Sequence, residues 1–219
     1  ADLASRGCGV QAGCTLVFLD GRFHQSFGEV PDGLVLRGLA DVLNTDPALA
    51  EKLLGAAVGA DAVGFAAMNG AHLADGAVVV VEPGTTIEAP INLVFAASTQ
   101  ENTASLPRNL IHLGDSAHAQ IVEHYTALDD SVHFTNTVTE ILLGRAAHLQ
   151  HTKLQEENSK SFHVCAIEVR QGADSFFASH ALSLGAALSR HDINTHFDGP
   201  GGTCEMNGLY LGAARQHMD

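Results

Sequence analysis

The chain has 219 residues, of which 46% are hydrophobic and 16% charged, so it can bury a substantial core. Eleven Lys and Arg against 25 Asp and Glu give a formal net charge of −14, which argues against binding nucleic acid or an anionic membrane electrostatically. Aromatic residues are 5% and tryptophan is absent, so small and aliphatic side chains must fill the core. No apolar run reaches the roughly 18 residues of a membrane span.

The first third of the chain indicates a mixture of strand and helix. Residues 16–23 predict a hairpin, because an Asp-Gly turn separates two apolar runs. Asp46 is a helix N-cap with Pro47 at the first helical position, and Gly55 is the expected stop. A second helix is expected over residues 61–73.

After residue 75 the sequence changes to short β-like runs separated by glycine turns. We therefore expect a partial α/β region over residues 1–75 and a β core over residues 76–219. Turn glycines recur in the core in steps of 30, 30, 28 and 29 residues, at Gly84, Gly114, Gly144, Gly172 and Gly201.

Each turn glycine is followed by the same alternation of side chains. Positions three and five residues later are small or apolar and should face inward: Ile87, Ala117, Ala147, Ser175 and Cys204, then Ala89, Ala119, Leu149, Phe177 and Met206. Positions four residues later should face outward: Glu88, His118, His148, Phe176 and Glu205. The pattern predicts a mainly β fold, a parallel β-solenoid whose coils stack in register. Repeated hairpins in a β-sandwich are the alternative.

The histidines include candidates for a metal site. His118 and His148 occupy the same repeat position, so adjacent coils should bring them to roughly 5 Å from each other. His124 shares the face of His118, and His151 is a further candidate ligand. An outward histidine ladder with a structural role is the alternative interpretation.

Three polar residues that follow His148 stand an odd number of positions after it, so in a regular strand they would face the opposite side of the sheet. His151, Lys153 and Gln155 would line the interior of the solenoid if their strand were regular, and buried polar groups require partners. A bulge that turns them outward is the alternative.

Patterns typical of catalysis are absent from the sequence. It contains no G-x-S-x-G, no H-E-x-x-H, no P-loop and no dinucleotide fingerprint. The adjacent carboxylates Asp129-Asp130 and Glu156-Glu157 are expected to lie in solvated turns. No catalytic residue is therefore predicted.

The four cysteines form no C-x-x-C pair. Cys8, Cys14, Cys165 and Cys204 are expected to be free thiols in a reducing cytoplasm.

Several segments, in the same order and spacing, resemble the SufB/SufD family of the SUF iron–sulfur cluster assembly system, and its SufD branch more than its SufB branch. They are residues 16–23, Pro107–Leu110, His118–Glu123, Phe134–Asn136, Ala147–Leu154, Phe162–Val164 and Asn207–Tyr210 with Gln216–Asp219. The resemblance implies a right-handed parallel β-helix preceded by a small, partly helical N-terminal region.

The same resemblance implies a function without catalysis. It implies a cytoplasmic scaffold subunit that pairs with SufB-like and SufC-like subunits, and a cluster that the full complex assembles rather than one bound by this chain. The SufC contact and the Cys-x-His segment belong to the family's C-terminal part, so Cys165 and Cys204 do not receive those roles. We expect the chain to be a fragment whose core is truncated, with self-association through the open β-helix end.

Two other functions remain alternatives. One is a β-helix hydrolase or lyase acting on polysaccharide, although aromatic platforms are scarce and the acidic residues are scattered. The other is a His-rich metal-binding β-domain that uses His118, His124 and His148.

Overall fold

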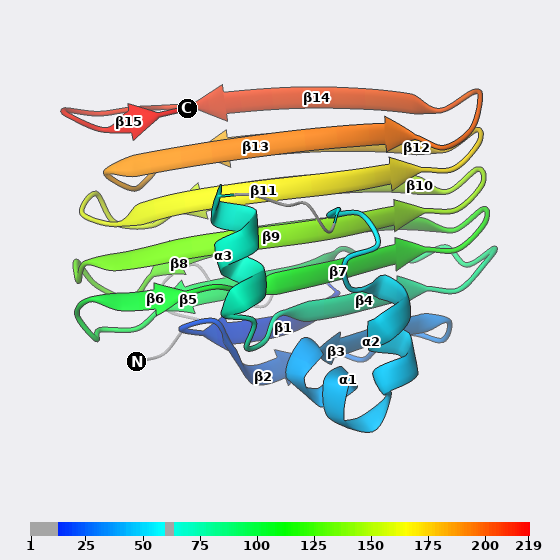
Figure 1. Ribbon diagram of the computed structural model, residues 1–219, viewed down its shortest axis with the longest axis horizontal. Helices are drawn as coiled ribbons and strands as arrows, with labels where there is room; N and C mark the ends of the chain where they lie inside the picture. Colours follow the sequence, from blue (N-terminus) through cyan, green and yellow to red (C-terminus); the bar gives the residue numbers. More distant parts are fainter. Residues whose placement is uncertain (1–12, 60–63) are drawn as a thin grey trace.

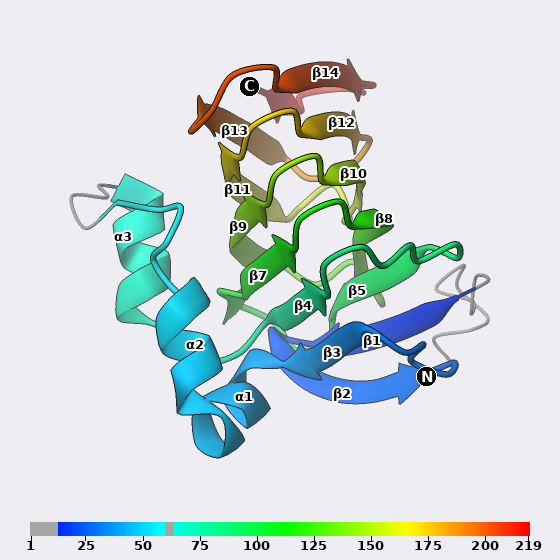
Figure 2. The same cartoon turned by 90° about the vertical axis from the view of Figure 1, so that its right-hand side faces the viewer.

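The computed structural model describes residues 13–59 and 64–219, which form a parallel β-solenoid with helices along one side (Figure 1). Its two sheets enclose the core between them, and each coil of the solenoid contributes one strand to each sheet (Figure 2). The expected mainly β fold with stacked parallel coils is confirmed.

Sheet A is the seven-stranded sheet. In spatial order its strands are β14 (Thr203–Tyr210), β12 (Phe176–Ser183), β10 (His148–Glu156), β8 (His118–Ala127), β5 (Ile91–Ala97), β1 (Cys14–Leu19) and β2 (Arg22–Phe27). Sheet B is the eight-stranded sheet. It consists of β15 (His217–Met218), β13 (Leu188–Phe197), β11 (Phe162–Gln171), β9 (His133–Leu143), β7 (Arg108–Leu113), β4 (Ala77–Val81) and β3 (Leu34–Gly38), with β6 (Thr103–Ser105) beside β9.

The N-terminal elements extend both sheets. The predicted hairpin is β1–β2, whose turn places Asp20 and Gly21 at φ 49° and 75°. Strand β1 pairs in parallel with β5, and β3 pairs antiparallel with β4. The sheets therefore continue on both sides of residue 75, and the domain boundary expected there stays a prediction.

Three short helices follow β3. Helix α2 (Pro47–Leu53) begins where predicted, and the Asp46 side chain accepts a hydrogen bond from the Leu49 N–H at 3.2 Å. Helix α1 (Leu39–Thr45) was not predicted, and α3 spans Gly64–Ala71 inside the expected residues 61–73. The helices lie along the outer face of sheet B (Figure 2). None of the helices in the described residues has the length and hydropathy needed to cross a membrane.

The repeat has the predicted parity but a different alignment. His118, His148, Phe176 and Thr203 stand in register on adjacent strands, so Thr203 occupies the place expected for Glu205. The turn glycines belong to two different positions. Gly84 and Gly201 share a left-handed backbone position with Ser116, Ala146 and Asp174 in the other turns, whereas Gly114, Gly144 and Gly172 lie two residues before that position. A shift of two residues preserves which side chains face inward.

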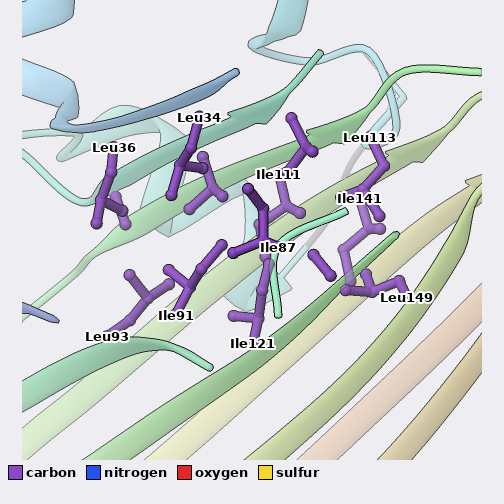
Figure 3. Close-up of a cluster of buried hydrophobic side chains, with 14 of the residues drawn as sticks. Leu34, Leu36, Ile87, Ile91, Leu93, Ile111, Leu113, Ile121, Ile141 and Leu149 are labelled. Atoms are coloured by element: carbon purple, nitrogen blue, oxygen red, sulfur yellow. The ribbon is translucent and has the colours of Figure 1, made fainter. Parts of the chain in front are cut away.

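The apolar core lies between the sheets. Leu93, Ile121 and Leu149 of sheet A face Ile111 and Ile141 of sheet B (Figure 3). All five side chains are buried, so one continuous core joins successive coils.

Three adjacent strands of sheet A, β1, β5 and β8, each contribute one aromatic ring to a stack in the core. The Phe18 and Phe95 ring centroids are 4.9 Å apart, and those of Phe95 and Tyr125 are also 4.9 Å apart. Tyr125 is the last ring of this stack and the first member of a polar interior.

Candidate functional site: a polar interior in the central coils

The interior of the central coils is lined by ionisable side chains. His151, Lys153 and Gln155 on β10 point inward and have exposed fractions of 0%, 1% and 0%. The inward orientation expected from strand parity is therefore confirmed, and β10 pairs in unbroken register with both neighbours. Glu123 and Tyr125 on β8 occupy the adjacent inward positions and are also fully buried.

Glu123 accepts three hydrogen bonds. The Tyr125 hydroxyl donates at 2.6 Å, the Thr139 hydroxyl at 2.8 Å, and His151 Nε2 lies 3.1 Å away. Burial opposes ionisation, but the contacts with His151, Tyr125 and Thr139 outweigh it and lower the pKa of Glu123 to about 2. Burial and the adjacent carboxylate raise the pKa of Tyr125 well above its usual value. Glu123 is therefore an ionised acceptor inside the solenoid.

Glu157 is a second buried carboxylate, which corrects the expectation that Glu156-Glu157 lies in a solvated turn. Its exposed fraction is 3%, and it accepts hydrogen bonds from Thr135 and from Gln155 Nε2 at 3.0 Å. His163 Nδ1 lies 2.7 Å from Oε2. Burial opposes ionisation here too, yet His163, His133 and Thr135 hold the pKa of Glu157 far below its usual range. Glu156 is exposed, as expected.

Lys153 is the buried cation of the interior. Its Nζ hydrogen-bonds to no atom of the described residues and lies 5.9 Å from the centre of the Tyr125 ring. Cys165 on β11 is also fully buried, and burial raises the pKa of its thiol to about 12. Because of this high pKa, the Cys165 thiol is not a nucleophile near neutral pH. His191, next to Cys165 in sheet B, has its pKa lowered to about 3 by burial and then by Lys153.

The candidate metal ligands are on opposite faces of sheet A. His118 and His148 lie side by side on its outer face, with ring centroids 5.3 Å apart. His151 faces the interior and contacts Glu123, and His124 contacts Glu156 at 2.9 Å. The proximity of His118 and His148 is as predicted, but His151 does not join them. Within residues 13–59 and 64–219, no three His, Cys, Asp or Glu side chains are arranged to hold a metal ion.

The cysteines of the described residues are free thiols. Cys14 and Cys165 are buried, and Cys204 is half-buried in β14. Cys8 lies outside the described residues.

A third carboxylate fastens the helical region to the outer face of sheet B. Glu140 on β9 accepts hydrogen bonds from the backbone N–H groups of Gly55, Ala57 and Val58 at 2.8 to 3.0 Å. Arg108 on β7 donates to its Oε1 from Nε at 3.0 Å and from Nη2 at 2.7 Å. This buried cluster positions the segment that leads into α3.

A second set of contacts completes this attachment. Asn69 of α3 donates to the carbonyls of Pro107 and Asn136 at 3.0 and 2.9 Å, and Asn136 Nδ2 donates to the Phe65 carbonyl at 2.9 Å. Polar contacts therefore hold α3 against β9.

The interior groups were only partly visible in the sequence. Strand parity identified His151, Lys153 and Gln155, and the same parity applied to β8 would have identified Glu123, which pairs in register with Lys153. Glu157 comes after the last residue of β10, so the alternation of side chains in that strand does not predict which way it faces. These interior side chains are buried between the two sheets, where they hold charge and hydrogen bonds.

These features define a class of protein: a parallel β-solenoid with an ionisable interior and a helical flank on one sheet. Comparison with known sequences identifies the family. Residues 95–219 match the family described as "SUF system FeS cluster assembly, SufBD core domain", and the chain belongs to this family.

Relatives in three organisms agree with this assignment. The chain is 29% identical over 208 residues to the iron-sulfur cluster assembly protein SufD of Escherichia coli, covering 93% of this chain and 47% of that protein. It is 30% identical to the SufBD family protein slr0076 of Synechocystis, with coverage of 71% and 36%, and 29% identical to the chloroplastic protein ABCI7 of Arabidopsis thaliana, with coverage of 71% and 34%. The chain spans less than half the length of these relatives.

Proposed function

We propose that this chain forms the solenoid part of a non-catalytic scaffold subunit for iron–sulfur cluster assembly in the cytoplasm. In this proposal it pairs with a SufB-like and a SufC-like subunit, and the full complex, rather than this chain, assembles the cluster. The single observation that supports it most is the match of residues 95–219 to the SufBD core, which covers the coils from β5 onward.

The enclosed interior supports a structural rather than a catalytic role. Glu123, His151 and Lys153 have exposed fractions of 0 to 1%, so no substrate reaches them in this conformation. The two buried carboxylates of this interior, Glu123 and Glu157, are both engaged by neighbouring side chains, which disfavours a role for either as a general base. Family membership also favours assembly over the alternative of a polysaccharide-acting enzyme.

Co-expression tests the proposed partners. The chain, carrying an affinity tag, is produced together with the SufB-like and SufC-like proteins of the same organism and purified at moderate salt. We expect both partners to elute with the chain in fixed ratio. Elution of the chain without either partner, while SufB-like and SufC-like proteins still bind each other, would contradict the proposal.

The surface that we propose for association is the end of the solenoid at β14. One edge of this strand pairs with β12, and Leu209, Tyr210 and Leu211 beside it have exposed fractions of 60%, 70% and 68%. A strand edge with apolar side chains is a template for another chain. Self-association through this end is part of the same proposal.

Substitution at this end tests the surface. Leu209→Glu and Leu211→Glu should reduce dimer or complex formation, measured by size-exclusion chromatography with light scattering. Phe27→Glu is the control, because Phe27 is exposed on β2 at the opposite end. Equal association of all three variants would show that the β14 end is not the contact surface.

A further inference from the structure

His133 is a buried histidine at a corner of the solenoid. It is the first residue of β9, has an exposed fraction of 3%, and lies where the loops after β8 and β10 meet. Its two ring nitrogens have different partners, and these partners determine where its protons are.

Nδ1 of His133 faces two hydrogen-bond acceptors. One is the carbonyl oxygen of Ser131 at 3.3 Å, and the other is Oγ of Ser161 at 2.9 Å. The Ser161 hydroxyl uses its own proton to donate to Oδ1 of Asn158 at 3.0 Å. A carbonyl cannot donate, and the single hydroxyl proton is already used. Nδ1 of His133 must therefore carry a proton.

The orientation of the Asn158 amide supports this assignment. Its Nδ2 donates to the carbonyls of Asp129 and Ser131 at 2.9 and 2.8 Å. Its Oδ1 accepts from the backbone N–H of Lys160 at 2.9 Å. A flipped amide would lose all three bonds, so Oδ1 is the acceptor that Ser161 faces.

Nε2 of His133 faces a carboxylate. Glu157 Oε1 lies 3.4 Å away. The Thr135 hydroxyl and Gln155 Nε2 donate to that carboxylate, His163 Nδ1 lies 2.7 Å from its Oε2, and its pKa is held far below the usual range, so it is ionised. In a neutral His133 with its proton on Nδ1, the unprotonated Nε2 would lie 3.4 Å from an anionic oxygen in a buried setting and would have no hydrogen-bond partner, which is unfavourable.

We propose that His133 carries protons on both ring nitrogens in the folded protein and is a buried imidazolium paired with Glu157. The assignment balances the charges of the interior. Glu123 has Lys153 as its neighbour in register, and Glu157 has His133. Two buried anions then stand against two buried cations, as buried charges require.

The other ionisable groups around His133 are consistent with a cation at this position. His163 Nδ1 on β11 lies 2.7 Å from Glu157 Oε2, and burial, followed by Lys153, lowers the pKa of His163, so it is the neutral histidine of the cluster. The Glu101 carboxylate accepts from the Val132 N–H at 3.0 Å, and that of Asp129 from the Ser131 N–H at 2.8 Å. Glu101, in the turn before β6, and Asp129, in the loop after β8, thus place carboxylates at the backbone of the two residues that precede His133.

Nuclear magnetic resonance of the 15N-labelled protein at pH 7 tests the assignment directly. We expect His133 to show protons on both ring nitrogens with imidazolium shifts, and His163 to show a proton on Nδ1 only. Glu157→Gln should convert His133 to the neutral form with its proton on Nδ1. A neutral His133 in the unmodified protein would overturn the proposal. If Glu157→Gln does not fold, the spectra of the unmodified protein still decide the question.

Discussion

Lys153 on β10 stands directly beside Glu123 on β8 in the parallel ladder, and both side chains are fully buried between the sheets. Lys153 Nζ has no hydrogen-bond acceptor among the described residues, whereas Glu123 has three donors. No hydrogen bond joins these two side chains, so charge is the only means by which they can be coupled.

Removal of the ammonium should destabilise the protein through this coupling. We expect Lys153→Met to lower the free energy of unfolding by roughly 2 to 3 kcal/mol, because Glu123 would lose its neighbouring positive charge. In the double variant with Glu123→Gln, the loss should be smaller than the sum of the single losses. Denaturant unfolding measures all three. Lys160→Met, at an exposed lysine, is the control, and strict additivity would show that the charges are not coupled.

Acid should weaken the protein through Glu123. Its pKa falls from 4.5 to about 2 on folding, so its contribution is complete above pH 4.5 and is lost as pH falls towards 2. A shift of this size corresponds to roughly 3 kcal/mol. Glu123→Gln should flatten the fall in unfolding free energy between pH 5 and pH 2.5, as measured by denaturant titration. Glu156→Gln, at the exposed neighbour of Glu157, should leave the acid profile unchanged.

The attachment of the helical region should depend on Glu140. Glu140→Ala removes the partner of Arg108 and the acceptor of three backbone N–H groups, so we expect a loss of about 3 to 5 kcal/mol. Amide exchange should rise first in residues 55–58. Asp41→Ala breaks the exposed pair with Arg37 and should cost below about 1 kcal/mol. Similar losses in both variants would contradict this account.

The two turn positions should respond oppositely to substitution. A Cβ added at Gly144 would lie 2.7 Å from the Asp115 nitrogen in the preceding coil, so Gly144→Ala should cost about 2 kcal/mol or more. Ala146 has φ 54°, where glycine is less strained, so Ala146→Gly should stabilise by roughly 0.5 kcal/mol. Thermal unfolding compares the two. Destabilisation by Ala146→Gly as large as that by Gly144→Ala would contradict this reading of the turn.

Local chemistry made much of the fold predictable. The Asp-Gly turn, the Asp46 cap and the alternation of side chains depend on neighbours in sequence, and they were found as expected, except that Met206 in the last coil is 47% exposed instead of buried. The exact alignment of Gly84 and Gly201 was not predictable, because glycine satisfies two separate needs in these turns. One is a left-handed backbone, and the other is close contact with the preceding coil.

The candidate site was predictable only where strand parity applied. His151 and Lys153 followed from parity. Glu157 and His133 acquire their roles from contacts between loops that are distant in sequence, such as Glu157 with His133 and Asn158 with Ser131. Adjacent carboxylates in a polar stretch indicate a solvated turn, and only the packed corner shows that one of them is inside.

Successive turns from His118 to Thr203 take 30, 28 and 27 residues, yet the paired strands remain in register. The differences in length are absorbed at the corners, including the turn at residues 198–202. Added or deleted residues at a corner leave the inward parity of every strand intact, whereas a single insertion within a strand would move Lys153 or Glu123 to the outer surface. The largely exposed corner at residues 198–202 is therefore a place where a label, an affinity tag or a guest domain can be introduced without changing the parity of the strands.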